Sequence, residues 1–169
     1  MTDTAVTGIV VQMMIVGAKL AAPDKEVAAI VGDGCFAMTC MEILTASANA
    51  LGVVYYVFND GELSQIAQAQ EIPFNRKPCT ALGAIDFSGV AIATGAEYIR
   101  VAANGDVPDA IVRARQFAAA GRPVIVDLVM DYSKRTAFTQ GAVKTNFKRL
   151  PLTQRLRMVT RAVKRRITG

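Results

Sequence analysis

The stretch that decides the fold runs from Val31 to Leu63 and reads VGDGCFAMTCMEILTASANALGVVYYVFNDGEL. Two apolar runs rich in β-branched residues, Val27–Val31 and Val53–Phe58, have the composition of buried β-strands. Each run is followed directly by a turn that carries a carboxylate, Gly32-Asp33-Gly34 after the first and Asn59-Asp60-Gly61 after the second. The two predicted strands therefore end in matching acidic turns.

The segment between the two turns, Met38–Ala50, has the apolar spacing of a helix, with Met38, Met41, Leu44, Thr45 and Ala48 on one face. A strand, a helix and a second strand form a βαβ unit, whose strands are parallel and whose crossover is right-handed. Both turns then lie at the carboxyl ends of neighbouring strands, where open α/β sheets bind ligands. We therefore expect Asp33 and Asp60, 27 positions apart, to converge on one point.

Two converging carboxylates indicate a site for a hard cation. Mg2+ prefers oxygen ligands and is usually held by one or two carboxylates together with the phosphate oxygens of a ligand. Gly32 and Gly34 allow a tight turn and a close approach of the backbone to a ligand. The amides from Gly34 to Phe36 open a helix, and helix amino termini favour phosphate oxygens. The prediction is a diphosphate held through Mg2+, against the alternative of two ordinary Asp-Gly turns.

The pair of turns resembles the thiamine diphosphate motif, in which G-D-G is followed, one βαβ unit later, by N-N or N-D. The surrounding sequence is similar to the carboxy-terminal cofactor domain of acetolactate synthase-like enzymes and their decarboxylase and oxidase relatives. The similarity covers residues 13–131 and includes Gly17–Leu20, Pro23-Asp24, Met41-Glu42 and Gly121–Val124. The motif is specific for the cofactors, thiamine diphosphate and Mg2+, and chooses poorly among reactions.

The resemblance also implies roles for individual residues. The Mg2+ ligands fall on the side chains of Asp33 and Asp60 and on the backbone carbonyl of Glu62. The cofactor-binding residues fall on Gly32, Asp33, Gly34, Cys35, Asn59, Asp60, Glu62 and Leu63, with Asn59 bracing its turn. A helix expected over Leu63–Gln70 lies beside the thiazolium ring in the family. Gln65 and Gln68 are therefore substrate-side candidates, against the alternative of a solvated helix face.

The glutamate that activates the cofactor in this family belongs to a pyrimidine-binding domain, usually that of the neighbouring subunit. Nothing in the 169 residues resembles that domain, and Glu42 lies in the diphosphate-side helix instead. The resemblance therefore implies no catalytic residue in this chain. It also implies a partner pyrimidine-binding domain or subunit, and hence a homo- or hetero-oligomer.

The rest of the sequence continues the alternation of strands and helices. The expected elements are helices over Ile9–Leu20, Phe87–Thr94 and Val107–Ala120, strands over Tyr98–Val101 and Val124–Val129, and a loop over Glu71–Leu82. This order predicts an α/β fold, a doubly wound parallel sheet with helices on both faces (the thiamine diphosphate-binding fold). We expect two domains, the cofactor-binding domain over residues 1–131 and a basic C-terminal extension over residues 132–169.

The composition of the chain limits the classes of function that it can have. With 52% hydrophobic and 20% charged residues, the chain is long enough to form a globular domain with a real core. It contains no histidine, which excludes a Ser-His-Asp or Cys-His nucleophile within this sequence. Its three cysteines lack C-x-x-C spacing, which is typical of reduced thiols in a cytoplasmic protein. The apolar run Gly8–Ala18 is too short to span a bilayer.

The extension differs sharply in charge from the rest. Residues 134–169 hold eleven lysines and arginines and no acid, whereas residues 1–133 hold eight basic and fourteen acidic residues, a balance of −6. A helix beginning near Pro151 carries Leu152, Leu156, Val159 and Val163 on one side and is therefore basic and amphipathic. Three interpretations stay open: docking on another domain or subunit, which we favour, an anionic membrane surface, and nucleic acid, for which no known module is visible.

The function hypothesis that follows is the diphosphate- and Mg2+-binding part of an acetolactate synthase-like carboligase acting on pyruvate or another 2-keto acid. One alternative is a subunit of a split 2-keto acid decarboxylase. Another, of a different class, is a non-catalytic partner or tethering protein that keeps the fold. Thr7-Gly8 favours the last alternative, because it is one residue out of register with a G-x-M-G-like cofactor loop of the family. The Asp33 and Asp60 pair opposes it.

Overall fold

The protein is described from a computed structural model, which defines residues 11–74, 76–131, 145 and 147–168. The chain divides into two compact units, which we describe separately. The first comprises residues up to Gly61 together with Gly83–Met130, and the second comprises Glu62–Leu82 and the chain from Asp131 onward. Thr7, Gly8 and the beginning of the helix expected from Ile9 lie outside the described residues. In the described chain, no helix is long and apolar enough to cross a membrane.

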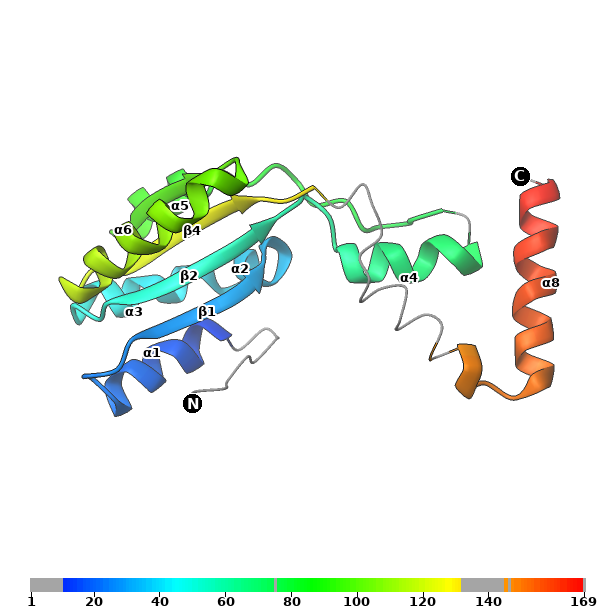
Figure 1. The fold of residues 1–169 in the computed structure, drawn as a ribbon, viewed down its shortest axis with the longest axis horizontal. Helices are drawn as coiled ribbons and strands as arrows, with labels where there is room; N and C mark the ends of the chain where they lie inside the picture. Colours follow the sequence, from blue (N-terminus) through cyan, green and yellow to red (C-terminus); the bar gives the residue numbers. More distant parts are fainter. Residues whose placement is uncertain (1–10, 75, 132–144, 146, 169) are drawn as a thin grey trace. The chain divides into compact units, whose positions relative to one another are not determined.

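A four-stranded parallel sheet forms the centre of the first unit (Figure 1). Its strands are β1 (Val27–Gly32), β2 (Val53–Asn59), β3 (Glu97–Val101) and β4 (Val124–Val129), in the spatial order β1-β2-β4-β3. β1 pairs with β2 so that Gly32 lies opposite Phe58. The two acidic turns therefore leave the same edge of the sheet from adjacent strands, as the sequence predicts.

Helices cover both faces of this sheet, which confirms the doubly wound α/β fold. The steps from β1 to β2 and from β3 to β4 run in opposite directions across the sheet, so right-handed crossovers place their helices on opposite faces. α2 (Asp33–Thr39) and α3 (Ile43–Ala48) share one core cluster with α1 (Val11–Ala21) and α5 (Phe87–Thr94). α6 (Val107–Ala119), preceded by the 3-10 turn η2 (Asn104–Asp106), packs on the other face.

The larger core cluster is centred on aromatic side chains. The Phe36 ring lies 5.8 Å from the Tyr55 ring and 5.4 Å from the Phe87 ring, the latter at an interplanar angle of 75°. Both spacings fall in the range where tilted aromatic pairs attract each other beyond simple burial. Since the three rings come from α2, β2 and α5, they fix both helices against the sheet directly behind the first acidic turn.

The helix predicted over Met38–Ala50 differs in the structure in two ways. It begins earlier, at Asp33, and it is interrupted by a 3-10 turn, η1 (Cys40–Glu42), that separates α2 from α3. Its core-facing residues are Phe36, Cys40, Ile43 and Ala46. The apolar face predicted from the sequence is exposed instead, with Met38, Met41 and Leu44 each about half accessible to solvent. The buried residues recur at an ordinary helical spacing, so the sequence indicated the wrong face of this segment; Phe36, which leads the buried face, lies before the predicted helix.

At the amino-terminal edge of the sheet, two glycines allow backbone segments to touch. A Cβ added to Gly52, just before β2, would lie 1.7 Å from the carbonyl oxygen of Ala118 in α6. A Cβ on Gly121 would lie 2.8 Å from the carbonyl oxygen of Ala50, and Gly121 also has a left-handed φ of +76°. No side chain fits at either contact, so this edge of the unit is held by close backbone packing.

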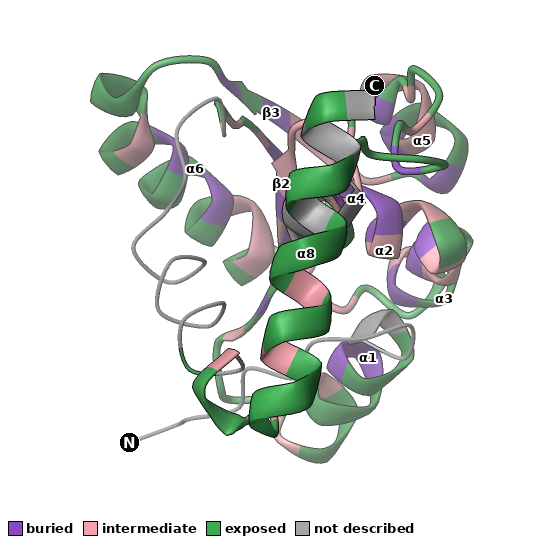
Figure 2. Ribbon diagram, turned by 90° about the vertical axis from the view of Figure 1, so that its right-hand side faces the viewer, coloured by how far each residue is buried: buried purple, intermediate pink, exposed green. Residues whose placement is uncertain are grey.

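The second unit contains two helices, α4 (Ser64–Phe74) and α8 (Leu152–Thr168), which contact each other. α4 continues to Phe74, so the prediction that a loop starts at Glu71 was wrong. Proline has no amide hydrogen, so it is tolerated best among the first four residues of a helix, whose amides have no carbonyl partner within the helix. Pro73 lies well beyond these positions, yet α4 continues for one residue after it. α8 confirms the helix expected after Pro151, and Figure 2 shows it as exposed along most of its length.

Candidate functional site

Asp33 is the centre of the candidate site. It stands directly after β1, is only 3% exposed, and begins α2. Its Oδ2 accepts hydrogen bonds from the backbone amides of Gly61, at 2.7 Å, and Asp60, at 3.2 Å. Its Oδ1 accepts from the amide of Gly34 at 2.7 Å. One buried carboxylate therefore joins the two acidic turns that the sequence predicted to converge.

Burial and Asp60 act together on this carboxyl group. Desolvation raises the pKa of Asp33 above its usual value of 3.8, and the nearby negative charge of Asp60 raises it further. The hydrogen bonds from Gly61, Gly34 and Asp60 lower it, but the net direction is upward. A cation placed between the two carboxylates would reverse this balance, because opposite charge stabilises the ionised form.

The turn after β2 has a backbone that suits only glycine at one position. Gly61 has a φ of +72°, in the left-handed region that L side chains rarely adopt, and this conformation aims its amide at Asp33. Gly32 is different, because its φ of −74° and ψ of 153° are open to any residue. The prediction that Gly32 makes a tight bend was therefore wrong. A Cβ there would meet nothing within 4 Å, so the space beside it is open.

The remaining first-turn residues are covered to different degrees. Gly34 is buried in the first turn of α2, whereas Cys35 is half-buried with a free thiol. The structure thus places Gly32, Asp33, Gly34 and Cys35 on one turn and Asn59 and Asp60 on the adjacent one.

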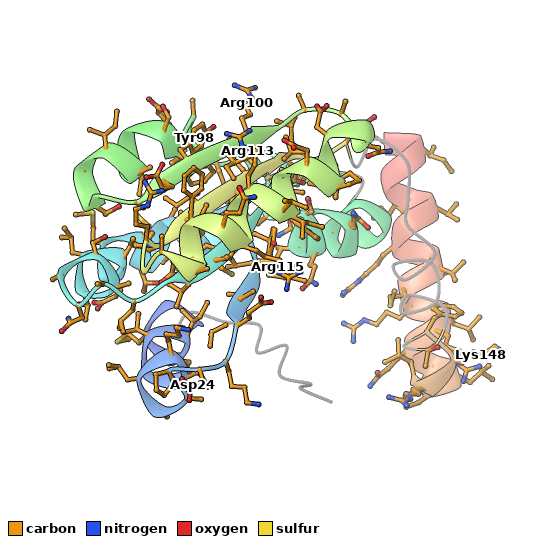
Figure 3. All side chains as sticks on the ribbon, turned by 60° about the vertical axis from the view of Figure 1, so that its left-hand side comes forward. Asp24, Tyr98, Arg100, Arg113, Arg115 and Lys148 are labelled. Carbon is orange, nitrogen blue, oxygen red and sulfur yellow. The ribbon has the colours of Figure 1, made fainter. Side chains whose placement is uncertain are left out.

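Two residues that sequence reasoning missed extend this site across the sheet. Asp127, on β4, is 5% exposed and accepts a hydrogen bond from Asn59 Nδ2 at 2.9 Å and from the Tyr98 hydroxyl at 2.8 Å. Tyr98 lies on β3, where Figure 3 labels it. The signal available beforehand was an aspartate inside the otherwise apolar run VIVDLV, since buried carboxylates are rare unless they have partners.

Glu62 and Leu63 belong to the second unit, directly after Gly61 in the chain. The Glu62 carboxylate accepts hydrogen bonds from Thr80 Oγ1 at 3.0 Å and from Lys77 Nζ at 3.2 Å. Its backbone carbonyl accepts from the amide of Ser64, and the Leu63 amide donates to the carbonyl of Thr80. These bonds tie the start of α4 to the segment around Thr80, and the Lys77 charge is paired with Glu62.

The two glutamines proposed to face the substrate lie on α4. Gln65 is exposed, whereas Gln68 is half-buried. The Gln68 side chain has a buried acceptor, Oε1, without a hydrogen-bond partner among the described residues. Gln65 is exposed, so water can satisfy its side chain.

A surface pocket of about 570 Å³ lies elsewhere in the first unit. It is lined by residues at the start of β1 and β2 and along α6, among them Val27, Gly52 and Arg115. Arg115 forms an ion pair with Glu26 at 2.7 Å on its rim. Because the pocket lies at the amino ends of the strands, it is not the place where Asp33 and Asp60 meet.

The donor set at the acidic turns fits Mg2+. Asp33 and Asp60 offer carboxylate oxygens, the ligands that hard divalent cations prefer, and the two groups lie close enough for one to shift the pKa of the other. Within the described residues no cluster of three or more His, Cys, Asp or Glu side chains gathers. A cation here would therefore need further oxygens from backbone carbonyls and from its ligand, as is usual for Mg2+ bound with a diphosphate.

Comparison with known proteins defines the class of this chain. The family described as "Thiamine pyrophosphate enzyme, C-terminal TPP binding domain" matches residues 12–128. The chain belongs to this family, and the site described above lies inside the matched region.

Particular relatives narrow the likeness to acetolactate synthases. The chain is 36% identical over 116 residues to a putative acetolactate synthase large subunit of Mycobacterium tuberculosis, covering 69% of this chain and 20% of that protein. It is 31% identical over 141 residues to the acetolactate synthase of Bacillus subtilis, covering 83% and 24%. Among solved structures, it is similar to a thiamine diphosphate-dependent 4-hydroxybenzoylformate decarboxylase of Rhodococcus jostii, with a TM-score of 0.62, 27% identity and coverage of 70% and 23%. The chain therefore spans about a fifth to a quarter of the length of these relatives.

Proposed function

We propose that this chain is the diphosphate- and Mg2+-binding part of an acetolactate synthase-like enzyme that joins 2-keto acids, with pyruvate as the first candidate substrate. The observation that carries the proposal is the buried Asp33 carboxylate, which accepts amide hydrogen bonds from the turn of Asp60 and Gly61. Asp33 and Asp60 bring two carboxylates to one edge of the sheet, and a cation between them would offset the repulsion that raises the pKa of Asp33. Membership in the thiamine pyrophosphate enzyme family supplies the chemical class of that group.

In this proposal residues of both turns and of the segment after them share the binding of Mg2+ and of the diphosphate. Asp33 and Asp60, with the backbone carbonyl of Glu62, hold Mg2+. Gly34, Cys35, Glu62 and Leu63 contact the diphosphate, and Gly32 belongs to the same cofactor-binding turn as Gly34. Asn59 braces its own turn, for which its hydrogen bond to Asp127 provides support. Thiamine diphosphate, when bound, supplies the carbon nucleophile and the electron sink for reactions of 2-keto acids. The residues of this chain bind and orient it, while Gln65 and Gln68 border the substrate.

The activating glutamate would come from a pyrimidine-binding domain outside these residues. We therefore expect the functional protein to be a homo- or hetero-oligomer, or to contain that domain elsewhere, and to act in the cytoplasm. A split 2-keto acid decarboxylase is a second candidate, favoured by the likeness to a decarboxylase structure. The third candidate, a non-catalytic tethering protein, is opposed by the Asp33 and Asp60 pair, which such a protein would not need.

Calorimetric titration of thiamine diphosphate and Mg2+ into the purified chain tests the proposal, first alone and then with pyrimidine-binding domains encoded beside it. We expect Mg2+-dependent binding that tightens when the partner is present, and the pair can then be assayed on pyruvate for carboligation against simple decarboxylation. Asp33→Ala is the matched control, because it removes one carboxylate. A folded chain that binds no cofactor with any partner would establish the tethering hypothesis in its place.

A further inference from the structure

Hydrogen bonds connect all four strands near the carboxyl edge of the sheet. Tyr98 on β3 donates to Asp127 on β4, and Asn59 at the end of β2 donates to the other oxygen of the same carboxylate. The turn that follows Asn59 donates two amides to Asp33 after β1. Since the strand order is β1-β2-β4-β3, this chain of bonds runs from one edge strand to the other.

Asn59 is held by β4 at two points. Its side chain donates to Asp127 at 2.9 Å, and its backbone carbonyl accepts from the amide of Met130 at 2.8 Å. The carbonyl bond extends the regular pairing of β2 with β4, in which Asn59 lies opposite Val129. The side-chain bond is additional, and it fixes the residue immediately before Asp60.

Asp127 is a buried carboxylate in a strand whose other residues are apolar, which is an unfavourable position for a charge without partners. It lies on a central strand, is 5% exposed, and occurs in a run of five apolar residues. A valine would fill this position without a desolvation cost. Both of its oxygens have partners, Asn59 and Tyr98, so its charge is used to hold two side chains from the two neighbouring strands. The pKa of Tyr98 is raised to about 12, first by burial and then by the bond to Asp127, whose charge disfavours loss of the hydroxyl proton.

We infer that Asp127, supported by Tyr98, is a positioning residue that fixes the Asn59-Asp60-Gly61 turn so that its amides face Asp33. This inference rests on the proposed function for its purpose, because the turn so positioned carries the second carboxylate of the Mg2+ site. The positioning itself is a property of the chain without any ligand. It can therefore be measured separately.

The test is amide hydrogen exchange, followed residue by residue by NMR, on the full chain without cofactor. In Asp127→Ala we expect the Asp60 and Gly61 amides to exchange roughly tenfold faster, the size expected for the loss of about one hydrogen bond. The amides of Val57 and Ile125, inside β2 and β4, should keep their rates. A uniform increase across the sheet would overturn the inference, since it would mean that Asp127 only stabilises the fold.

Tyr98→Phe is a gentler variant that does not depend on the folding of Asp127→Ala. It removes the hydroxyl donor to Asp127, and we expect a smaller increase at the same two amides. Tyr55→Phe is its matched control, because the buried Tyr55 hydroxyl has no hydrogen-bond partner within the described chain. Equal effects of the two tyrosine variants would count against the inference. Asp127→Asn retains an acceptor for Asn59 and should restore most of the protection lost in Asp127→Ala.

Cofactor titration of the same variants separates the two proposals. If the wild type binds thiamine diphosphate with Mg2+ and Asp127→Ala binds it about tenfold more weakly, as supporting residues around metal ligands typically do, both proposals are supported. If the wild type binds neither alone nor with any pyrimidine-binding partner, the proposed function fails, while the exchange result still decides the positioning role. If the wild type and Asp127→Ala bind equally and their exchange at Asp60 and Gly61 is equal, the positioning inference fails alone.

Discussion

The unit built on the parallel sheet buries its large apolar side chains, whereas helix α8 leaves its own exposed. In the first unit, Phe36, Ile43 and Ile125 are fully buried between the sheet and its helices. On α8, the apolar stripe of Leu152, Leu156, Val159, Val163 and Ile167 is between 48% and 79% exposed. Figure 2 shows the contrast between buried segments of α2, α3 and α6 and the exposed length of α8. The sheet unit has a core of its own, whereas α8 leaves its apolar stripe exposed within the described chain.

Contact with α4 does not remove this exposure. α8 touches α4, yet the half-buried side chains along it are Arg155 and Met158, which lie beside the apolar stripe rather than in it. Arg155 is turned back to its own chain, with Nε donating to the Leu150 carbonyl at 2.7 Å. The stripe is therefore still without a covering surface among the described residues, and this favours docking on another domain or subunit.

A core substitution in the sheet should have the largest effect. Phe36→Ala removes a ring that is 0% exposed and contacts both Tyr55 and Phe87, and we expect a loss of about 3–5 kcal/mol in the free energy of unfolding. Urea denaturation followed by circular dichroism measures it. A loss below about 1 kcal/mol would show that the sheet unit, like α8, depends on contacts outside itself.

The second expected effect concerns binding. Asp33→Ala removes a carboxylate of the predicted Mg2+ site, and we expect affinity for thiamine diphosphate with Mg2+ to fall about a hundredfold or more. Titration calorimetry measures this, and Asp24→Ala, at an exposed position before β1, is the control. Unchanged affinity in the Asp33 variant would mean that the acidic turns are structural only.

A smaller effect is expected from the turn backbone. Gly61→Ala places a side chain on a residue with a φ of +72°, which costs about 1–2 kcal/mol. Because a Cβ there meets no neighbouring residue within 4 Å, the cost comes from the local backbone conformation alone. Gly32→Ala, at an equally open but extended position, should change the unfolding free energy far less. Similar losses in the two variants would contradict the left-handed turn.

The pH dependence of stability gives a fourth test. The folded-state pKa of Asp33 is raised, so the folded chain binds this proton more tightly than the unfolded chain does. The stabilisation it provides is therefore complete below the ordinary value of 3.8 and is lost as pH rises through the raised pKa. Denaturation of the wild type and of Asp33→Asn across this range should show the loss only in the wild type. A loss on lowering the pH that Asp33→Asn abolishes would reverse the assignment.

Substitution of the α8 stripe should have the smallest effect on folding. Leu156 is 59% exposed, so Leu156→Ala should change the unfolding free energy of the isolated chain by less than about 0.5 kcal/mol. Under the docking interpretation the same change weakens association with the partner chain. Flotation with anionic vesicles at low and high salt is the decisive comparison, because salt-sensitive binding lost in Leu156→Ala would establish the membrane interpretation instead.

The sequence predicted the sheet and its acidic edge because the relevant signals are local. β-branched runs, Asp-Gly turns and the handedness of crossovers are enough to place Asp33 beside Asp60. The buried face of this helical segment was not predicted correctly, because Phe36 lies before the predicted helix and its packing on Tyr55 and Phe87 depends on residues remote in the chain. The extension of α4 to Phe74 was missed because Pro73 was taken as a loop signal.

The role of Asp127 could not be read from the sequence because its partners are remote in the chain. Asn59 is 68 positions away and Tyr98 is 29 positions away, and only the strand order brings the three together. The binding roles assigned to all the site residues, from Asp33 and Asp60 to Gln65 and Gln68, and the domain boundary at residue 131 stay predictions. They concern segments whose contacts with a cofactor or a partner depend on molecules outside this chain.

The glycine contacts at the amino-terminal edge have a consequence for how such a domain can diversify. Gly52 against Ala118 and Gly121 against Ala50 leave no room for a side chain at these two positions, although a surface pocket opens beside Gly52. The opposite edge consists of turns held mainly by side-chain and amide hydrogen bonds, which can be exchanged one at a time. Substitution is therefore restricted by neighbouring backbone at Gly52 and Gly121, whereas no neighbouring atom restricts it at Gly32 or Gly61 in the acidic turns.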